Sequence, residues 1–310
     1  MASLKIIFAG SGEFGGPTLS ALLNAHHEVV QVLTQPDRPA GRGRLLTPTP
    51  IASLAASRGL TVLKTGNINK ESLPPADLMI VIAFGQKISP QIVDHARLKA
   101  INLHASILPK YRGAAPINWA IIKGETVAGN SIIRLAERMD AGAILAQSSL
   151  PIGETETAGE LHDRLAADGA ALVLKTIDGL MTNRVSETPQ DETQATMAPK
   201  LSRAAATLDF KRPAAEISNQ IRGMFPWPGC TIELTDSSST QRDIVTLVRS
   251  QVASAPVETL WPGSTTKTGI VAGDGKVVEI LEVQPQGKRP MPLAAYQNGH
   301  AWLDRQAVSR

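Results

Sequence analysis

The groups best suited to chemistry in this 310-residue chain lie close together in the segment 101–117, which reads INLHASILPKYRGAAPI. Apolar and polar residues alternate at its start, so an extended strand would carry the amide of Asn102 and the imidazole of His104 on one side. The segment then breaks at Pro109 into a polar run, which is typical of a strand that ends in a loop. Because open α/β sheets build their sites at strand ends, this side is a candidate reaction face.

Each of these residues also has a purely structural interpretation. Asn102 is a residue type that caps turns, and a lone histidine such as His104 is more often a hydrogen-bonded core residue. Asp140 precedes Ala-Gly between two apolar runs, which fits ordinary turn chemistry. Taken one at a time, these residue types leave both interpretations open.

Strand-like and helix-like runs alternate through the first part of the chain. Short apolar runs predict strands at 4–9, 28–34, 61–63, 77–83 and 100–105, with helices at 17–25, 51–59 and 90–98. This order predicts an α/β fold with a doubly wound, mainly parallel sheet. Right-handed crossovers would bring the carboxyl ends of its strands to one crevice.

The later part of the chain has a different pattern. The runs 131–139 and 143–152 predict a hairpin that continues the sheet and carries Asp140 at its tip. The chain then turns polar over about 185–206, and a helix-like run follows at 214–224. Short β-like runs with glycine-rich turns predict a small barrel from the segments 230–234, 243–252, 268–273 and 276–284.

Composition agrees with two globular domains. The chain is 43% hydrophobic and 19% charged, enough to bury a sizeable core. We expect a first domain at 1–184, a linker at 185–206 and a second domain at 207–310. The single cysteine, Cys230, excludes an internal disulfide, and the six histidines lack the spacing of metal ligands, so we expect no metal.

The sequence also bears on the cellular location, the partners and the oligomeric state of the protein. The N-terminal sequence has no long apolar region with a small-residue cleavage site, and no apolar run reaches the roughly 18 to 20 residues that span a bilayer. We therefore expect a cytoplasmic protein without membrane contact. A net charge of +3 permits an anionic partner without requiring one. No long heptad pattern is present, so we expect a monomer.

A glycine pattern near the N-terminus supports an alternative function. Gly10, Gly12 and Gly15 form G-x-G-x-x-G between a predicted strand and a predicted helix, and Asp37 lies near the spacing of a ribose-binding acid. This pattern would suit an NAD(P)-dependent oxidoreductase. However, Asp37 falls beyond the predicted end of its strand, and any tight strand-to-helix turn favours glycine. We favour the turn interpretation.

The segment 102–109, NLHASILP, followed by RGAAPI, resembles the formyl-folate site of the folate-dependent formyltransferases, with Ile107 in place of the commoner Leu. The resemblance extends along the chain in one order, through TQPDRPAGRGRLLTPTP (34–50), VIAFGQKI (81–88), MDAGAIL (139–145), APKLSR (198–203) and FPWPGC (225–230). It implies a Rossmann-like catalytic domain followed by an OB-like β-barrel domain that contacts tRNA.

The resemblance also implies that Asn102, His104 and Asp140 are the catalytic residues. Attack of an amine on the formyl group of a folate creates an oxyanion that needs donors, and the amine must lose a proton while N10 gains one. Asn102 and a protonated His104 can donate to that oxygen. Asp140 would favour the charged imidazole and can pass protons through a water. No covalent intermediate is required.

The remaining site residues rest on the same resemblance for folate and methionine, and mainly on charge for tRNA. Backbone groups and apolar walls that suit a flat pterin are expected at Phe84, Gly85, Gln86, Ile88, Ser106, Ile107, Leu108 and Pro109. Cationic side chains that suit tRNA phosphates, several of them in the flexible loop 34–50, are Arg38, Arg42, Arg44, Lys200, Arg203 and Arg222. Phe225, Pro226 and Trp227 would wall a pocket for methionine or, alternatively, form an interdomain packing corner.

The function implied by the resemblance is transfer of the formyl group of 10-formyltetrahydrofolate to the amino group of methionyl initiator tRNA, for translation initiation. Alternatives within the class are formyltransferases that act on a glycinamide nucleotide or an amino sugar, and a hydrolase of the same formyl-folate. The basic loop and the appended barrel argue against them. A tRNA-binding protein with an inactive catalytic domain is a further alternative, which the intact catalytic set disfavours.

Overall fold

The computed structural model describes residues 3–41, 43–235, 243–256 and 260–310, so the predicted tRNA contact Arg42 lies outside the described residues. The chain forms two compact units. The first comprises Met1–Gly113, Gly129–Leu150 and His162–Met197, and the second comprises Ala114–Ala128, Pro151–Leu161 and Ala198–Arg310. Two segments of the predicted first domain, 114–128 and 151–161, thus cluster with the second unit, and 185–197 of the predicted linker clusters with the first.

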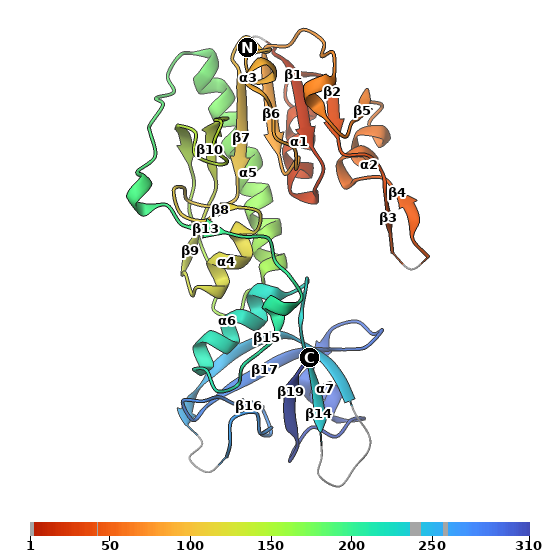
Figure 1. The fold of residues 1–310 in the computed structure, drawn as a ribbon, viewed down its shortest axis with the longest axis vertical. Coiled ribbons are helices and arrows are strands. Elements are labelled where there is room, and N and C mark those ends of the chain that lie inside the picture. The colour runs from red at the N-terminus through yellow and green to blue at the C-terminus, as the bar shows by residue number, and fades with distance from the viewer. Residues whose placement is uncertain (1–2, 42, 236–242, 257–259) are drawn as a thin grey trace. The chain divides into compact units, whose positions relative to one another are not determined.

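The first unit is built on a seven-stranded sheet in the order β11-β10-β7-β6-β1-β2-β5 (Figure 1). Five strands pair in parallel: β1 (Lys5–Gly10), β2 (Glu28–Thr34), β5 (Val62–Lys64), β6 (Leu78–Ile82) and β7 (Ala100–His104). Two antiparallel strands, β10 (Ser131–Arg134) and β11 (Ile144–Gln147), extend the sheet beyond β7. The mainly parallel sheet is confirmed, and so is the antiparallel pair around Asp140, although its strands are shorter than predicted.

Both faces of this sheet are covered. On one face, Gly15 lies against Phe8 of β1 and against Ile51 of α2 (Pro50–Ser57). Helix α5 (Ala158–Met181) covers the same face so closely that a Cβ at Gly169 would meet Leu103 Cδ2 at 2.7 Å. On the other face, a buried cluster joins the strands to η2 (Ile68–Lys70) and α3 (Pro90–Val93), with Ile7, Ala9, Leu33, Ile68, Met79, Val81, Phe84, Ile92, Ala96 and Ala100 as members. Burial on both faces explains why the strands are continuously apolar.

Helix α5 is not among the predicted elements. The segment Thr157-Ala-Gly-Glu160 at its start is a capping box, in which the Glu160 carboxylate accepts from Thr157 N and Oγ1 at 2.9 Å and Thr157 Oγ1 accepts from Glu160 N at 3.4 Å. Apolar residues at helical spacing, such as Leu161, Leu165 and Ile177, are fully buried.

Smaller elements complete the first unit. They are η1 (Glu13–Gly15), α1 (Gly16–Asn24), the hairpin strands β3 (Arg38–Ala40) and β4 (Leu45–Thr47), β8 (Arg112–Gly113) and η3 (Glu192–Gln194). Short strands β9 (Val127–Ala128), β12 (Leu150–Pro151) and β13 (Met197–Ala198) include residues of the second unit.

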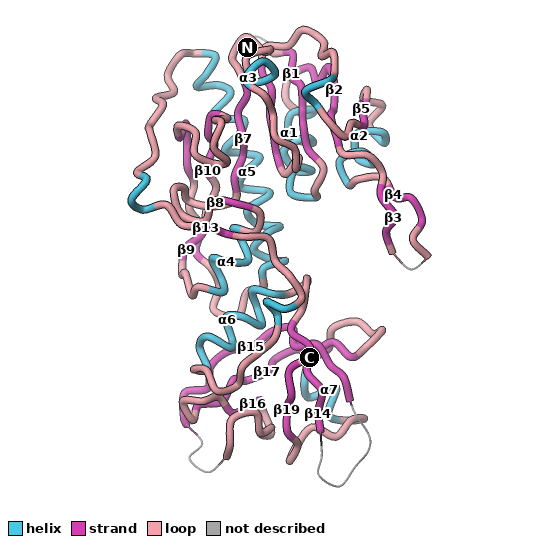
Figure 2. The backbone as a smooth tube through the Cα atoms, viewed as in Figure 1, coloured by secondary structure: helices cyan, strands magenta, loops and turns pink. Residues whose placement is uncertain are grey.

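The second unit consists mainly of strands (Figure 2), and these strands pair antiparallel. The strands follow the order β16 (Gly269–Val271), β17 (Lys276–Pro285), β15 (Asp243–Pro256), β14 (Cys230–Thr235) and β19 (Gln306–Ser309), and β18 (Met291–Pro292) pairs with β17. Isolated bridges from Ser264 to Gln306 and from Thr265 to Ile270 nearly close the sheet, because they place 264–265 between its two edge strands. The barrel-like second domain is confirmed. Its helical elements are α4 (Pro116–Ile122), η4 (Ala204–Ala206), α6 (Ala214–Met224) and α7 (Leu293–Gln297).

The glycine pattern at the first turn is explained by packing. A Cβ at Gly10 would meet the Phe8 ring at 2.8 Å and the carbonyl oxygen of Ile82 at 3.0 Å, so a side chain has no room there. Asp37, the residue near the ribose-binding spacing, forms an ion pair with Lys64 at 2.7 Å. These contacts support the turn interpretation and weaken the oxidoreductase alternative. Among the described residues, no helix is both long and apolar enough to cross a bilayer.

Candidate active site

The amide and the imidazole lie at the carboxyl end of β7. Asn102 is in register with Val81 of β6 and with Ile133 of β10, and His104 is the last residue of its strand. Two positions apart on one strand, both side chains point to the same face of the sheet, as predicted. Asn102 is half-buried, and its amide has no hydrogen bond to any other described residue. It is therefore available to a ligand.

The ring of His104 lies between a backbone carbonyl and a carboxylate. It is 7% exposed, with Nε2 at 2.9 Å from Tyr111 O and Nδ1 at 3.6 Å from Asp140 Oδ2. A carbonyl oxygen only accepts, so we assign a hydrogen to Nε2. The second ring proton, when present, would then be on Nδ1, the atom nearest the carboxylate.

Asp140 is held by its own backbone as well as by its side chain. The residue has a φ of 54°, in the left-handed region that is uncommon for residues with a Cβ. Its Oδ2 accepts from Gly113 N at 2.9 Å, and its carbonyl oxygen accepts from Gln190 Nε2 at 2.8 Å. The loop between β10 and β11 thus presents the carboxylate in one defined orientation.

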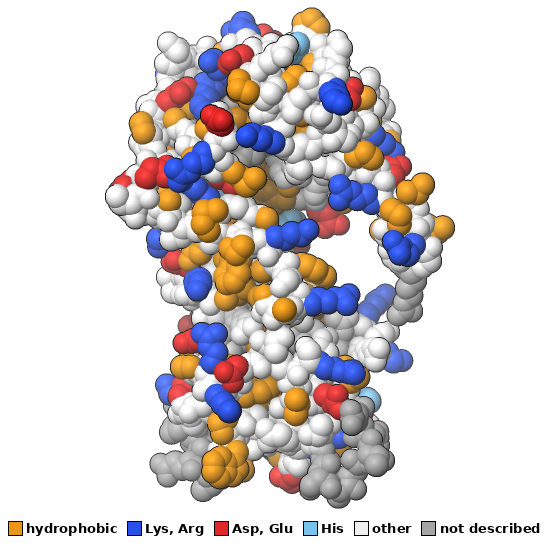
Figure 3. Space-filling model, in the orientation of Figure 1, with side chains coloured by type: hydrophobic (Ala, Val, Ile, Leu, Met, Phe, Trp, Pro, Cys, Tyr) orange, Lys and Arg blue, Asp and Glu red, His pale blue; other side chains and the backbone are white. Residues whose placement is uncertain are grey.

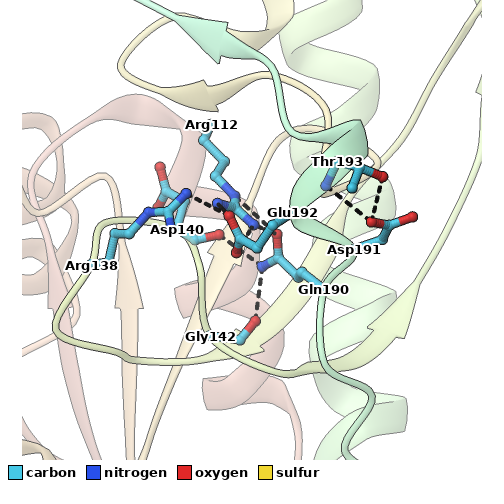
Figure 4. A network of polar contacts seen from close by, with 8 residues as sticks. All are labelled: Arg112, Arg138, Asp140, Gly142, Gln190, Asp191, Glu192 and Thr193. Carbon is cyan, nitrogen blue, oxygen red and sulfur yellow. Dashed lines mark hydrogen bonds and ion pairs between the residues drawn. The ribbon is translucent and has the colours of Figure 1, made fainter.

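A buried guanidinium adjoins this loop (Figure 4). Arg112 is 2% exposed and donates from Nε and Nη2 to Gln190 Oε1 at 3.0 and 2.7 Å. It also pairs with both carboxylate oxygens of Glu192, at 3.0 and 2.9 Å, and these hydrogen bonds lower the pKa of Glu192. Arg138 contacts the same carboxylate at 2.5 Å. None of these residues was predicted from the sequence to have a role, although Arg112 stands at the start of the RGAAPI run.

The two segments expected to hold folate follow neighbouring strands, β6 and β7, and therefore lie at the same edge of the sheet. Several of their groups serve the fold itself. Gln86 bonds at both ends of its amide to backbone, since Oε1 accepts from Ile68 N at 2.8 Å and Nε2 donates to Thr65 O at 2.7 Å. The carbonyl oxygens of Phe84 and Gly85 accept from one side-chain nitrogen, Gln35 Nε2.

The second of these segments is anchored in a similar way. Ser106 is buried and donates to Lys110 O at 2.6 Å, and Leu108 N donates to Ser131 Oγ at 3.0 Å. Among the residues expected to contact folate in the two segments, those that retain accessible surface are Gly85, Gln86, Ile88, Ile107 and Pro109. They can form walls for a flat ligand.

The loop 34–50 contains the hairpin β3–β4, which carries basic and apolar side chains together (Figure 3). Arg38 and Arg44 are exposed, and Arg38 donates to Gln35 Oε1 at 2.8 Å. Leu45 and Leu46 are 74% and 72% exposed. The hairpin thus exposes cations and apolar side chains side by side.

The other predicted tRNA and methionine contacts belong to the second unit. Lys200, Arg203, Pro226 and Trp227 are exposed and Phe225 is half-buried. In contrast, Arg222 is only 8% exposed, donates to Glu156 O and Asn219 Oδ1, and has a pKa lowered by burial. It lines a cavity of about 490 Å³ within this unit.

Comparison with known proteins identifies the family. Residues 4–177 match the family model described as formyl transferase, and residues 200–301 match the one described as formyl transferase, C-terminal domain. The chain belongs to the formyl transferase family, an assignment that confirms the resemblance seen in the sequence.

Within that family, the chain is similar over nearly its whole length to methionyl-tRNA formyltransferases. It is 40% identical over 305 residues to the methionyl-tRNA formyltransferase of Acidobacterium capsulatum, covering 96% of this chain and 97% of that protein. It is 38% identical to the methionyl-tRNA formyltransferase of Methylococcus capsulatus, with the same coverage.

A solved structure shares the fold. The N-formyltransferase of Helicobacter canadensis, in complex with folinic acid and dTDP-3-aminofucose, matches with a TM-score of 0.68 and 19% identity, covering 89% of this chain and 99% of that one.

Proposed function

We propose that this chain is a methionyl-tRNA formyltransferase, which transfers the formyl group of 10-formyltetrahydrofolate to the amino group of methionyl initiator tRNA. The observation that carries the proposal is the Asn102 amide, which has no hydrogen bond among the described residues, beside the pair that His104 at the end of β7 forms with Asp140 of the β10–β11 loop. The similarity to the two methionyl-tRNA formyltransferases extends over both domains and supports the acceptor.

The geometry suggests how the chemistry is divided. Asn102 donates to the formyl oxygen as negative charge develops on it. His104 Nε2 already has an acceptor in Tyr111 O, so the expected donation from His104 to the same oxygen is not part of this proposal. Instead, His104 Nδ1 and Asp140 Oδ2, which are 3.6 Å apart, hold the proton that the attacking amine loses. The proton then passes to N10 of the folate.

The other roles follow from the resemblance and the similarity. We propose that folate lies against the loops after β6 and β7, with contacts drawn from Phe84, Gly85, Gln86, Ile88, Ser106, Ile107, Leu108 and Pro109. For tRNA we propose contacts at Arg38, Arg42, Arg44, Lys200, Arg203 and Arg222, although Arg222 is buried within the second unit. Phe225, Pro226 and Trp227 would contact methionine. The proposed functional division remains 1–184, 185–206 and 207–310, in a monomeric cytoplasmic enzyme that uses no metal.

The test is a formylation assay. Purified protein is incubated with 10-formyltetrahydrofolate and charged initiator tRNA, and formyl-methionine is measured after mild deacylation. His104→Ala should abolish product. His95→Ala is a matched control, because Nε2 of that exposed histidine also contacts a backbone carbonyl, Pro74 O, at 2.8 Å.

Each outcome has a definite meaning. Formylation that His104→Ala abolishes and His95→Ala preserves would support the proposal. No product with charged tRNA, but product with an amino-sugar nucleotide, would refute the acceptor. Formate as the only product would indicate a hydrolase.

A further inference from the structure

The three residues 111–113 contact both of the groups that are proposed to move the proton. Tyr111 O accepts from His104 Nε2 at 2.9 Å, and Gly113 N donates to Asp140 Oδ2 at 2.9 Å. The residue between them, Arg112, points its side chain away from solvent, with 2% of it exposed. Whatever fixes Arg112 therefore also fixes the backbone that spaces the imidazole from the carboxylate.

Gln190 connects Arg112 to the Asp140 loop (Figure 4). Its Oε1 accepts two hydrogen bonds from the guanidinium, at 3.0 and 2.7 Å. Its Nε2 donates to Asp140 O and to Gly142 O, both at 2.8 Å. These two carbonyl groups flank the turn in which Asp140 has its φ of 54°.

A glutamine is the side chain that suits this position. One end must accept from a cation and the other must donate to two carbonyl oxygens, and only an amide offers both at one planar group. The segment that carries Gln190 is also tied to the 109–112 turn by backbone, since Arg112 N donates to Thr196 O at 2.8 Å and Tyr111 N donates to Thr196 Oγ1 at 2.9 Å. The segment thus belongs to the site, although the sequence predicted a linker.

We infer that Gln190 is a positioning residue that holds Asp140 against His104 through its two donated hydrogen bonds. The inference rests on the proposed function. Buried Arg112 orients the Gln190 amide, and the amide keeps the Asp140 turn in its left-handed conformation. In the proposed mechanism the proton is held between the Asp140 carboxylate and His104 Nδ1. A shift of the carboxylate by a fraction of an ångström would change the distance between these two groups.

The decisive variant is Gln190→Glu in the full chain. The new carboxylate can still accept hydrogen bonds from Arg112, but it cannot donate to Asp140 O and Gly142 O. The variant therefore removes the two bonds that position Asp140 and keeps the pairing with Arg112. We expect kcat for formylation to fall on the order of 10²-fold, because small misplacements of reacting groups have effects of that size. We expect KM for both substrates to change by less than about twofold. Gln190→Ala should behave alike if it folds.

Gln194→Ala is the matched control. Gln194 lies in the same segment and is exposed, and its side-chain amide donates to Asp191 Oδ2 at 2.8 Å. Its kcat should stay at the wild-type value. A Gln190→Glu enzyme with wild-type kcat and wild-type pH profile would overturn the inference.

A second readout keeps the inference separate from the proposed function. The ring ¹⁵N resonances of His104, assigned by their loss in His104→Ala, report the surroundings of Nδ1 whatever the acceptor is. They should shift in Gln190→Glu and not in Gln194→Ala. If the wild type formylates no tRNA, the proposed function fails while these resonances still test the positioning. Unchanged resonances in Gln190→Glu would refute the positioning.

Discussion

Replacing Glu160 by glutamine should make the protein less stable at neutral pH and remove part of its sensitivity to acid. Glu160 closes the capping box at the start of α5 and pairs with Arg249, whose Nη2 and Nη1 donate to its two oxygens at 2.5 and 3.1 Å. These hydrogen bonds, with those from Thr157, lower the pKa of Glu160 from 4.5 to about 2.

The size of the effect follows from that shift. Lowering the pKa from 4.5 to about 2 corresponds to about 3.5 kcal/mol if fully realised, at ~1.4 kcal/mol for each pKa unit. The side chain is 47% exposed, so solvent screening reduces the expected contribution to about 1 to 2 kcal/mol. Because the folded pKa lies below the unfolded one, this stability is complete above pH 4.5 and is lost as the pH falls towards about 2.

The measurement is urea unfolding of wild type and Glu160→Gln at pH 7 and pH 3. The glutamine still accepts from Thr157 N, so the comparison isolates the charge. The difference between the two proteins should shrink by more than half at pH 3. Glu154→Gln, an exposed carboxylate of the same segment with no hydrogen bond to another described residue, should show no such difference. An equal difference for Glu160→Gln at both pH values would refute the reasoning.

Three further predictions concern the site and the cores. Asn102→Ala should lower kcat for formylation roughly 10²- to 10³-fold with little change in melting temperature, because one oxyanion donor is lost; an unchanged kcat would contradict that role. Cys230, fully buried with its pKa raised by burial to about 12, should resist iodoacetamide at pH 8 until urea is added, as followed by mass spectrometry. Gly223→Ala should lower the melting temperature by an amount equivalent to about 1 to 3 kcal/mol, since its Cβ would meet Ile122 Cγ1 at 2.5 Å, whereas Gly16→Ala, with 3.8 Å to its nearest neighbour, should not.

The strand that carries Asn102 and His104 could be predicted from the sequence, whereas the long-range contacts around it could not. Alternation of polar and apolar residues is a local signal, so the shared face of Asn102 and His104 could be predicted without the structure. The contact between Arg112 and Gln190 joins residues 78 positions apart, and no local pattern marks it. The polar composition of 185–206 predicted a linker because it contains few apolar residues, yet its hydrogen bonds tie part of it to the first unit.

Two features carried a local signal that was not used. The capping box from Thr157 to Glu160 and the helical spacing of apolar residues after it mark the start of α5. Likewise, Arg222 follows the buried Ser218 by four positions on α6, so the two lie on one helix face and burial could be expected for both. The prediction of Arg222 as a tRNA contact rested on charge alone.

The order in which the barrel strands appear along the chain affects how the protein is made. β14 pairs with β15 on one side and with β19 on the other, and Ile232 pairs with Ser309, 77 residues further along the chain. At roughly 5 to 20 residues per second, a ribosome needs about 4 to 15 s to make that stretch. During this interval one edge of β14 is without its final partner, and unpaired edges recruit other strands. Slow translation through 235–305 would therefore lengthen the period in which nascent chains can associate wrongly.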